Sequence, residues 1–243
     1  LKNAATIGVA DSTSAITIAS TGIVTFVDDI LLKDACTIGT ATTAGAIAIA
    51  ADGTVDLDTA GATVASAVIK TAGKESIWVP AGAMYPSTTN PCSDLTQVET
   101  TALRPDLKVL DFAADVDDFA QFSVAFPKSW NEGTVTFQPF WTVTGTNTGT
   151  VAWSLSGIAA SSDDSINVAF GTAAVTTALA HSGTSNDLMV SVESGAITIA
   201  GSPAAADCCF FQIARDVSAD SQSGDARLLG IKLLFTTDAT NDA

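Results

Sequence analysis

The one histidine of the chain, His181, decides whether a catalytic triad of serine, histidine and acid is available. Residues 178–186 read ALAHSGTSN, and the glycine, serines and asparagine of this segment are typical of a loop. A solvated loop position is a simpler interpretation of His181 than a general base. The G-x-S-x-G motif, which presents a nucleophilic serine on a sharp turn, is missing. We therefore expect no catalytic residue of this type.

Two converging carboxylates could hydrolyse a glycosidic bond if the fold held them at a set separation. The only glutamates are Glu75, Glu99, Glu132 and Glu193. A cluster of aspartates comprises Asp111, Asp115, Asp117 and Asp118. The cluster lacks the glycine and the terminal glutamate of an EF-hand loop, and a solvated turn is its simpler interpretation. Pairing of these acids in space and casual calcium binding stay open, but the sequence predicts no catalytic acid and no metal ligand.

The cysteines and glycines give no sign of a cofactor site. The four cysteines are Cys36, Cys92, Cys208 and Cys209. No C-x-x-C motif is present, and with one histidine a zinc site would need most of the thiols to converge. We expect small, buried, reduced thiols. Glycine motifs that cradle phosphate are missing as well, so we expect no cofactor and no enzyme.

The charge balance narrows the class of partner. Ten basic residues stand against 26 acidic ones in 243 residues, a formal net charge of -16, which disfavours nucleic acid and anionic membrane as partners. No apolar run approaches the roughly 18 to 20 residues that span a bilayer. Between Lys128 and Arg215 there is no lysine or arginine. The exposed surface of this stretch should be rich in Thr, Ser and Gly, which suits hydrogen bonding to polar or sugar ligands.

Two consecutive segments near the N-terminus are copies of one another. Residues 5–26 and 36–57 align without a gap at an offset of 31, with ten identities in 22 positions. Each copy alternates apolar and polar residues, passes a glycine at position 22 or 53, and alternates again, which predicts a β-hairpin with one apolar face.

One such hairpin buries too little to be stable alone, so the apolar stripe needs a partner surface. We predict a fibre shaft over residues 1–70, in which identical chains share the stripe around a common axis as a homotrimer. The predicted trimer core comprises Ile16, Ile18, Val24, Phe26, Ile47, Ile49, Val55 and Leu57. The alternative is two hairpins of an ordinary sandwich sheet.

A proline-rich segment leads from the repeats to a larger domain. Residues 71–92 are expected to be a linker and crossing segment, because Pro80, Pro86 and Pro91 oppose helix and central strand. Trp78 and Tyr85 are expected to fix this segment to a neighbouring surface.

Residues 93–243 are predicted to form a β-sandwich head of jelly-roll type, so the whole chain is expected to be all-β. Expected strands cover residues 107–113, 119–126, 134–143, 150–158, 188–192, 196–200, 209–214 and 227–236. A short helical turn is expected at 163–171, capped by Asp163 or Asp164. Trp141, Trp153 and Phe140 could stack on a sugar, but core positions are the better interpretation of aromatics that alternate along strands.

Four segments carry a resemblance to a known family. The run WVPAGAMYP at residues 78–86, the stretches at 110–113 and 119–137, and DARLLGIK at 225–232 resemble virion structural proteins of tailed phages, notably marine phages. The similar segments lie within residues 77–236, and the repeats before them resemble phage fibre shafts.

This resemblance implies a trimeric fibre or spike on the tail or capsid of a virion that is assembled in the bacterial host cytoplasm. Its partners would be copies of itself, other virion proteins and, at the cell surface, a host glycan. The resemblance carries no catalytic residue. A polysaccharide-degrading enzyme borne on a fibre and a bacterial surface adhesin are the alternatives.

Overall fold

The computed structural model describes residues 73–204 and 206–237 and, before them, residues 6–9, 12–18, 20–21, 23–26, 36–38, 47–49 and 55–56. The chain divides into two compact units, residues 1–66 and 67–243. Strands dominate both units, and all pairings between the named strands are antiparallel. The all-β class predicted from the sequence is confirmed. No helix in the described ranges is long and apolar enough to cross a membrane.

The first unit contains two three-stranded sheets of the same design. The first sheet comprises β1 (Thr6–Val9), β2 (Ser12–Ile18) and β3 (Val24–Phe26). The second comprises β4 (Cys36–Ile38), β5 (Ile47–Ile49) and β6 (Val55–Asp56). The pair Ile18↔Val24 of the first sheet recurs as Ile49↔Val55 in the second, at the sequence offset of 31.

The first repeat presents apolar side chains to solvent in a single chain. Ile23, Val24 and Phe26 are all exposed. Exposed apolar residues at the end of a hairpin are expected if their partner surface belongs to another molecule. The shared-axis shaft remains a prediction, and Leu57 of its predicted core lies outside the described residues.

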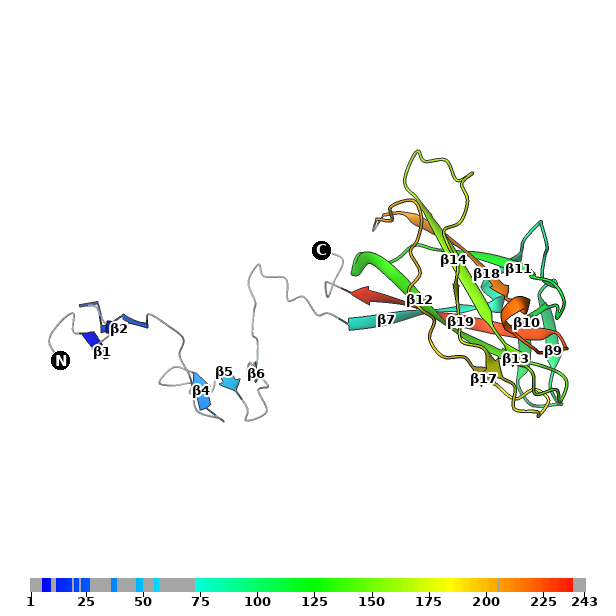
Figure 1. Cartoon of the computed structure of the whole chain (residues 1–243), viewed down its shortest axis with the longest axis horizontal. Helices are drawn as coiled ribbons and strands as arrows, with labels where there is room; N and C mark the ends of the chain where they lie inside the picture. Colours follow the sequence, from blue (N-terminus) through cyan, green and yellow to red (C-terminus); the bar gives the residue numbers. More distant parts are fainter. Residues whose placement is uncertain are drawn as a thin grey trace. The chain divides into compact units, whose positions relative to one another are not determined.

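The second unit is a sandwich of two sheets (Figure 1). The six-stranded sheet comprises, in order, β17 (Met189–Val190), β12 (Trp130–Thr142), β19 (Ala226–Thr237), β10 (Asp106–Phe112) and β9 (Thr96–Glu99), with β7 (Gly73–Pro80) also paired to β19. Figure 1 shows β12 and β7 on either side of β19.

The five-stranded sheet forms the second layer. It comprises, in order, β15 (Ala174–Val175), β14 (Trp153–Ala160), β18 (Cys208–Arg215), β11 (Phe119–Val124) and β8 (Tyr85–Pro86). β13 (Thr150–Val151) and β16 (Leu179–Ala180) pair with each other as a separate two-stranded antiparallel sheet. Two single turns of 3-10 helix complete the described elements, η1 (Ala81–Ala83) and η2 (Val217–Ala219).

Aromatic side chains join the inner faces of the two sheets. Phe112 of β10 meets Trp153 of β14 edge to face, with ring centroids 5.1 Å apart. Phe126, just after β11, contacts Phe211 of one sheet and Phe235 of the other. Period-two alternation places every second residue of these strands in this shared core, as the sequence predicts for β12 and β14. The β-sandwich is therefore confirmed.

One charged pair is buried at the end of β18. The Arg215 side chain is fully buried, and its guanidinium donates to both carboxylate oxygens of Asp220. The same group donates to the carbonyl oxygens of Phe112 and Gly224. A guanidinium with this many partners fixes the loop after β18 to the end of β10.

The segment 71–92 is more regular than the sequence predicts. It passes from one sheet to the other, but residues 73–80 form β7 and residues 85–86 form β8 instead of a linker. Both strands lie at the side of a sheet, where proline is tolerated because no second ladder needs its missing N–H. Trp78 and Tyr85 are about half exposed and do not fix the segment by burial.

Two further local predictions need correction. Residues 163–171 form no helical turn, because Asp163 adopts a positive φ of 74° and Asp164 instead accepts from the backbone N–H of Ser161. The expected strand at 196–200 is reduced to two isolated bridges, at Ile197 and Ala200.

Candidate functional site

A row of polar side chains crosses the outer face of the five-stranded sheet. Gln121 of β11 lies directly opposite Tyr85 of β8 on one side and Gln212 of β18 on the other. Gln212 in turn lies opposite Ser156 of β14. Directly paired residues share a face, so these four side chains form one line perpendicular to the strands. Their strand neighbours, among them Phe122, occupy the core.

Two cavities lie side by side on this face and share Tyr85 and Gln121. The apolar cavity has a volume of about 280 Å³, and its other lining residues are Ile158, Ile166, Val168, Phe170 and Phe210. The polar cavity has a volume of about 360 Å³, and its other lining residues are Pro86, Ser87, Thr88, Thr89 and Gln212. We call the two cavities together the sheet-face groove.

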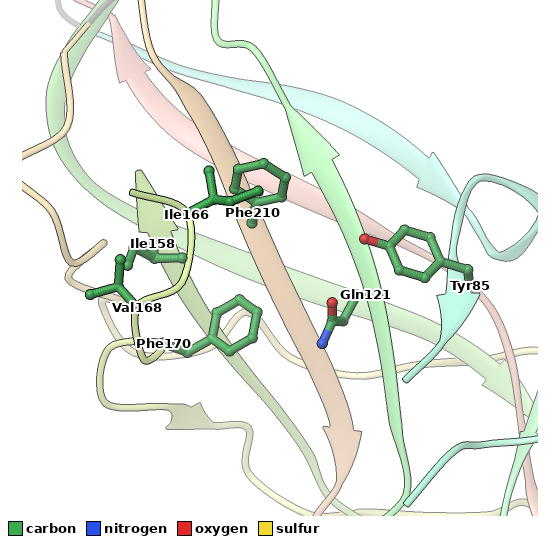
Figure 2. Close-up of a pocket in the computed structure, with 7 residues that line it drawn as sticks. All are labelled: Tyr85, Gln121, Ile158, Ile166, Val168, Phe170 and Phe210. Atoms are coloured by element: carbon green, nitrogen blue, oxygen red, sulfur yellow. The ribbon is translucent and has the colours of Figure 1, made fainter. Parts of the chain in front are cut away.

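Figure 2 shows how the side chains of the apolar cavity lie. The hydroxyl of Tyr85 points from β8 toward the cavity, and Gln121 lies between Tyr85 and the apolar side chains. The rings of Phe170 and Phe210 and the aliphatic side chains gather on the far side. The cavity thus has a polar edge and an apolar wall.

The apolar wall depends on the loop between β14 and β15, which is anchored at both ends. At its start, Ser161 Oγ donates to the buried Asp207 at 2.6 Å. At its end, the N–H of Gly171 donates to the Gly157 carbonyl at 3.1 Å. A Cβ at position 171 would lie 3.0 Å from the Thr198 carbonyl oxygen, so glycine permits this close approach. The loop holds Ile166, Val168 and Phe170 over the sheet.

The polar groups of the groove have unused hydrogen-bonding capacity. Within the described ranges, the Tyr85 hydroxyl and the side-chain amides of Gln121 and Gln212 make no hydrogen bond to another residue. Ser87 is only 7% exposed, and its buried hydroxyl makes no hydrogen bond to any residue that the structure describes. An unsatisfied buried polar group costs about 1 to 3 kcal/mol, which applies to the Ser87 hydroxyl; Tyr85, Gln121 and Gln212 are accessible to solvent and can exchange water for a ligand.

No charged side chain lines either cavity among the residues that the structure describes. The perturbed titratable groups lie elsewhere. Burial raises the pKa of the Cys92 thiol to about 12 and that of the Cys209 thiol to about 12. Burial also raises the pKa of Asp111, although Arg227 opposes it, and hydrogen bonds from Lys74 and Thr136 lower the pKa of Glu193. The groove is thus lined by uncharged side chains, with Tyr85 as its one titratable group among the described residues.

His181 is buried, contrary to the solvated position expected. It is 2% exposed, and its Nδ1 lies 3.1 Å from the Asn147 carbonyl oxygen and accepts from the Gly183 N–H at 3.3 Å. His181 directly follows β16, and its backbone N–H donates to the Gly149 carbonyl just before β13, which extends the pairing of these two strands to His181. No serine hydroxyl is hydrogen-bonded to this imidazole within the described part of the chain.

The aspartate cluster is partly structural instead of a solvated turn. Asp111 pairs with Arg227 at 3.0 Å, and the buried Asp118 accepts from the N–H of Ala113. Asp117 accepts from the N–H of Val217. The carboxylates of Asp111, Asp117 and Asp118 thus accept hydrogen bonds from an arginine and from backbone N–H groups. In the described residues no three acids, histidines or cysteines converge as a metal site would require.

The thiol prediction holds in part. Cys92 and Cys209 are buried and free, whereas Cys208 is exposed because adjacent residues on β18 point to opposite faces. Trp141 and Trp153 are fully buried, which confirms the core interpretation of these two residues, whereas Phe140 is half-buried and meets Trp78 outside the core, so the same interpretation of Phe140 is wrong.

The sequence does not identify the residues of the groove. It places Tyr85 in the expected crossing segment and assigns no role to Gln121 or Gln212. A signal does exist: glutamine occupies the polar phase of two strands whose other phase is apolar, at residues 119–124 and 208–215. Gln138 of β12 shows the same pattern on the other outer face of the sandwich, so the pattern predicts an outward-facing amide but does not identify the groove.

Comparisons with known proteins give only distant likenesses. No protein family matches the sequence, and no curated protein is similar to it at a significant level. A cycloisomaltooligosaccharide glucanotransferase from Paenibacillus sp. is similar in structure at 12% identity and a TM-score of 0.33, over 61% of this chain and 17% of that enzyme.

A family 11 carbohydrate-binding module from Clostridium thermocellum is similar at 11% identity and a TM-score of 0.33, over 74% of this chain and 95% of that module. Carbohydrate-binding modules of the β-sandwich superfamily give 7% identity and a TM-score of 0.28, over 80% of this chain and 70% of that chain. Likenesses this distant assign neither a family nor a ligand to the chain.

Proposed function

We propose that the second unit is a carbohydrate-binding domain and that a neutral glycan lies in the sheet-face groove. The observation that carries the proposal is the row of Tyr85, Gln121 and Gln212, whose hydroxyl and amides are unpaired within the described residues. A sugar hydroxyl both donates and accepts, and a glutamine amide does the same. The C–H bonds of a sugar ring are weakly positive and pack on the negative face of an aromatic ring such as Tyr85.

The composition of the groove supports a neutral ligand over a charged one. With no basic side chain lining it, the groove offers no partner for a carboxylate or sulfate, and the chain as a whole is strongly acidic. Cavities of about 280 and 360 Å³ lie near the lower end of the size range typical of small-molecule sites, roughly 300 to 1,000 Å³. Two adjoining cavities favour a glycan of more than one sugar residue.

The larger setting of this domain is also a proposal. In it, the chain is a virion fibre or spike of a tailed phage, with a trimeric shaft, a jelly-roll head and a host-surface glycan as the ligand. It is supported by the resemblance of residues 78–86, 110–113, 119–137 and 225–232, and by the identical strand register of the two repeats. The exposed Val24 and Phe26 support a shared shaft. A binding protein is preferred to a fibre-borne hydrolase, because no carboxyl group lines the groove among the described residues and glycoside hydrolysis ordinarily uses two.

A binding panel tests the carbohydrate proposal. The chain is titrated by calorimetry with neutral oligosaccharides of glucose, mannose, galactose, xylose and N-acetylglucosamine, and with anionic uronic-acid oligosaccharides as a contrast. We expect at least one neutral glycan to bind, and Tyr85→Ala to abolish that binding. Trp78→Ala is the matched control, because Trp78 is 48% exposed and Tyr85 50%, and the two lie on different sheets. No binding across the panel, or binding lost only in Trp78→Ala, would contradict the proposal.

Light scattering tests the shaft. Ile16→Asp combined with Ile47→Asp places charges on the predicted shared stripe and is expected to yield monomers from a trimeric wild type. Thr17→Asp combined with Ala48→Asp is the control, since adjacent residues on a strand point to the opposite face. A wild-type monomer, or a double Ile variant that stays trimeric, would refute the shared axis.

A further inference from the structure

The apolar cavity differs from the polar cavity in the chemistry of its walls. Beyond the shared Tyr85 and Gln121, all of its lining side chains are hydrocarbon. Plain sugar hydroxyls would meet no hydrogen-bonding group on those walls. A glycan of simple hexoses therefore explains the polar cavity, whereas the apolar cavity calls for a ligand group that has a hydrocarbon end.

The exposed positions of two aliphatic residues support a ligand at this place. Ile166 and Val168 are well exposed, although both line the apolar cavity together with Phe170 and Phe210 (Figure 2). Exposed apolar clusters with a polar edge are typical of binding sites. The loop that carries these two residues is anchored through Ser161 and Gly171, so the wall is held in place without the ligand.

Gln121 limits the chemistry of the group that enters. Its side-chain amide lies at the edge of the apolar cavity and offers both a donor and an acceptor. An acetamido group matches this edge and this wall together: its amide is trans, so its N–H and its methyl group lie on the same side, and the N–H donates to the glutamine oxygen while the methyl group packs on hydrocarbon. An O-acetyl ester lacks the N–H, and a carboxylate lacks both the donor and a basic partner here.

We propose that the apolar cavity binds the acetamido group of an N-acetylated hexosamine, which makes N-acetylated glycans the class of ligand that the groove binds. This inference rests on the proposed carbohydrate function and narrows it. The acetyl methyl group lies against Val168 and Phe210, and the amide bonds to Gln121. Burial of the methyl group together with one amide hydrogen bond corresponds to about a tenfold gain in affinity over the matching sugar with a free hydroxyl.

Saturation-transfer NMR on the full chain tests the inference with matched probes. The probes are N-acetylglucosamine against glucose, N-acetylgalactosamine against galactose, and N-acetylmannosamine against mannose. We expect about tenfold tighter binding of the acetylated sugar in at least one pair, with the acetyl methyl as its most strongly saturated group. Equal or weaker binding of the acetylated sugar in every pair would overturn the inference, while the proposed function would stand.

Two variants locate the effect. Val168→Ser is expected to reduce the preference for the acetylated sugar to about twofold without loss of binding by the plain sugar. Val192→Ser is the control, since Val192 is 56% exposed and Val168 57%, and Val192 lies outside the groove. A preference unchanged in Val168→Ser would overturn the inference. No binding of any of the six sugars, together with a silent oligosaccharide panel, would overturn the proposed function with it.

Discussion

The two outer faces of the sandwich present equally exposed aromatic side chains in different surroundings. On the six-stranded sheet, the ring of Trp78 meets Phe140 edge to face at 5.1 Å, and the Lys232 ammonium lies 5.6 Å from the centre of the Phe140 ring. Gln138, opposite Lys232 on β12, donates its amide to the Ser191 carbonyl at 3.0 Å. The polar and aromatic groups of that face therefore satisfy one another.

On the five-stranded sheet the corresponding groups remain available. Gln121 and Gln212 lie side by side with no hydrogen bond to another described residue, and the Tyr85 hydroxyl points into a cavity. Because Trp78 and Tyr85 are equally exposed but only Tyr85 has unpaired polar neighbours, an exposed aromatic ring does not by itself indicate a binding face. Unused hydrogen-bonding groups beside a cavity do so, because a ligand can satisfy them at no loss to the fold.

The largest expected effect acts on both faces alike. Arg215→Met removes the guanidinium and leaves Asp220 buried without its partner, together with the carbonyls of Phe112 and Gly224. We expect the free energy of unfolding to fall by about 3 to 5 kcal/mol. Urea denaturation measures it. Arg227→Met, at a more exposed pair, is the control and should cost about 1 kcal/mol or less. Equal losses in the two variants would contradict this account of the core.

The next effect should separate the faces. Gln121→Leu replaces the amide by a hydrocarbon side chain without donor or acceptor, so glycan affinity should fall by about 2 kcal/mol, roughly thirtyfold. Gln138→Leu on the opposite face should leave affinity unchanged. Calorimetry with the tightest neutral oligosaccharide of the panel measures both. An equal loss in both variants would show that the two faces do not differ.

A smaller effect should grade the groove itself. Gln212 lines only the polar cavity, whereas Gln121 lines both. Gln212→Leu should therefore weaken the same glycan by about 1 kcal/mol, roughly fivefold, in the same titration. A loss larger than that of Gln121→Leu would place the centre of the site in the polar cavity.

The smallest effect concerns pH and the six-stranded sheet. Hydrogen bonds from Lys74 and Thr136 lower the pKa of Glu193 in the folded state, so this carboxylate contributes stability above its unfolded pKa and loses it as the pH falls through its folded pKa. The pair is largely exposed, so Lys74→Met should cost at most about 0.5 kcal/mol at neutral pH and nothing in acid. Denaturation curves at both pH values measure this. A cost that grows in acid would reverse the assigned sign.

The sequence predicts the sandwich because alternation is local. Val135, Phe137 and Trp141 share one face of β12 whatever strand pairs with it, and burial confirms the face. The repeat likewise predicts the common register of the first unit, since each pairing lies within one copy.

The groove could not be predicted in the same way, because distant segments build it. Tyr85 belongs to a strand of two residues among prolines, and Gln121 meets Gln212 only through the register of β11 with β18. Three residues of the apolar wall, Ile166, Val168 and Phe170, alternate along a loop that forms no strand, and the position of this loop depends on Asp207 and Gly157. The solvated position predicted for His181 is wrong for the same reason, because the burial of this residue follows from the pairing of β13 with β16.

Side-chain amide NMR tests the central claim most directly. The NH₂ resonances of Gln121, Gln212 and Gln138 are assigned by single substitutions and followed while the tightest neutral oligosaccharide of the panel is titrated into the full chain. Direct bonding to the ligand predicts large shifts for Gln121 and Gln212, and no shift for Gln138. Shifts at Gln138 and the Trp78 indole, with Gln121 and Gln212 unmoved, would place the glycan on the other face and contradict the account.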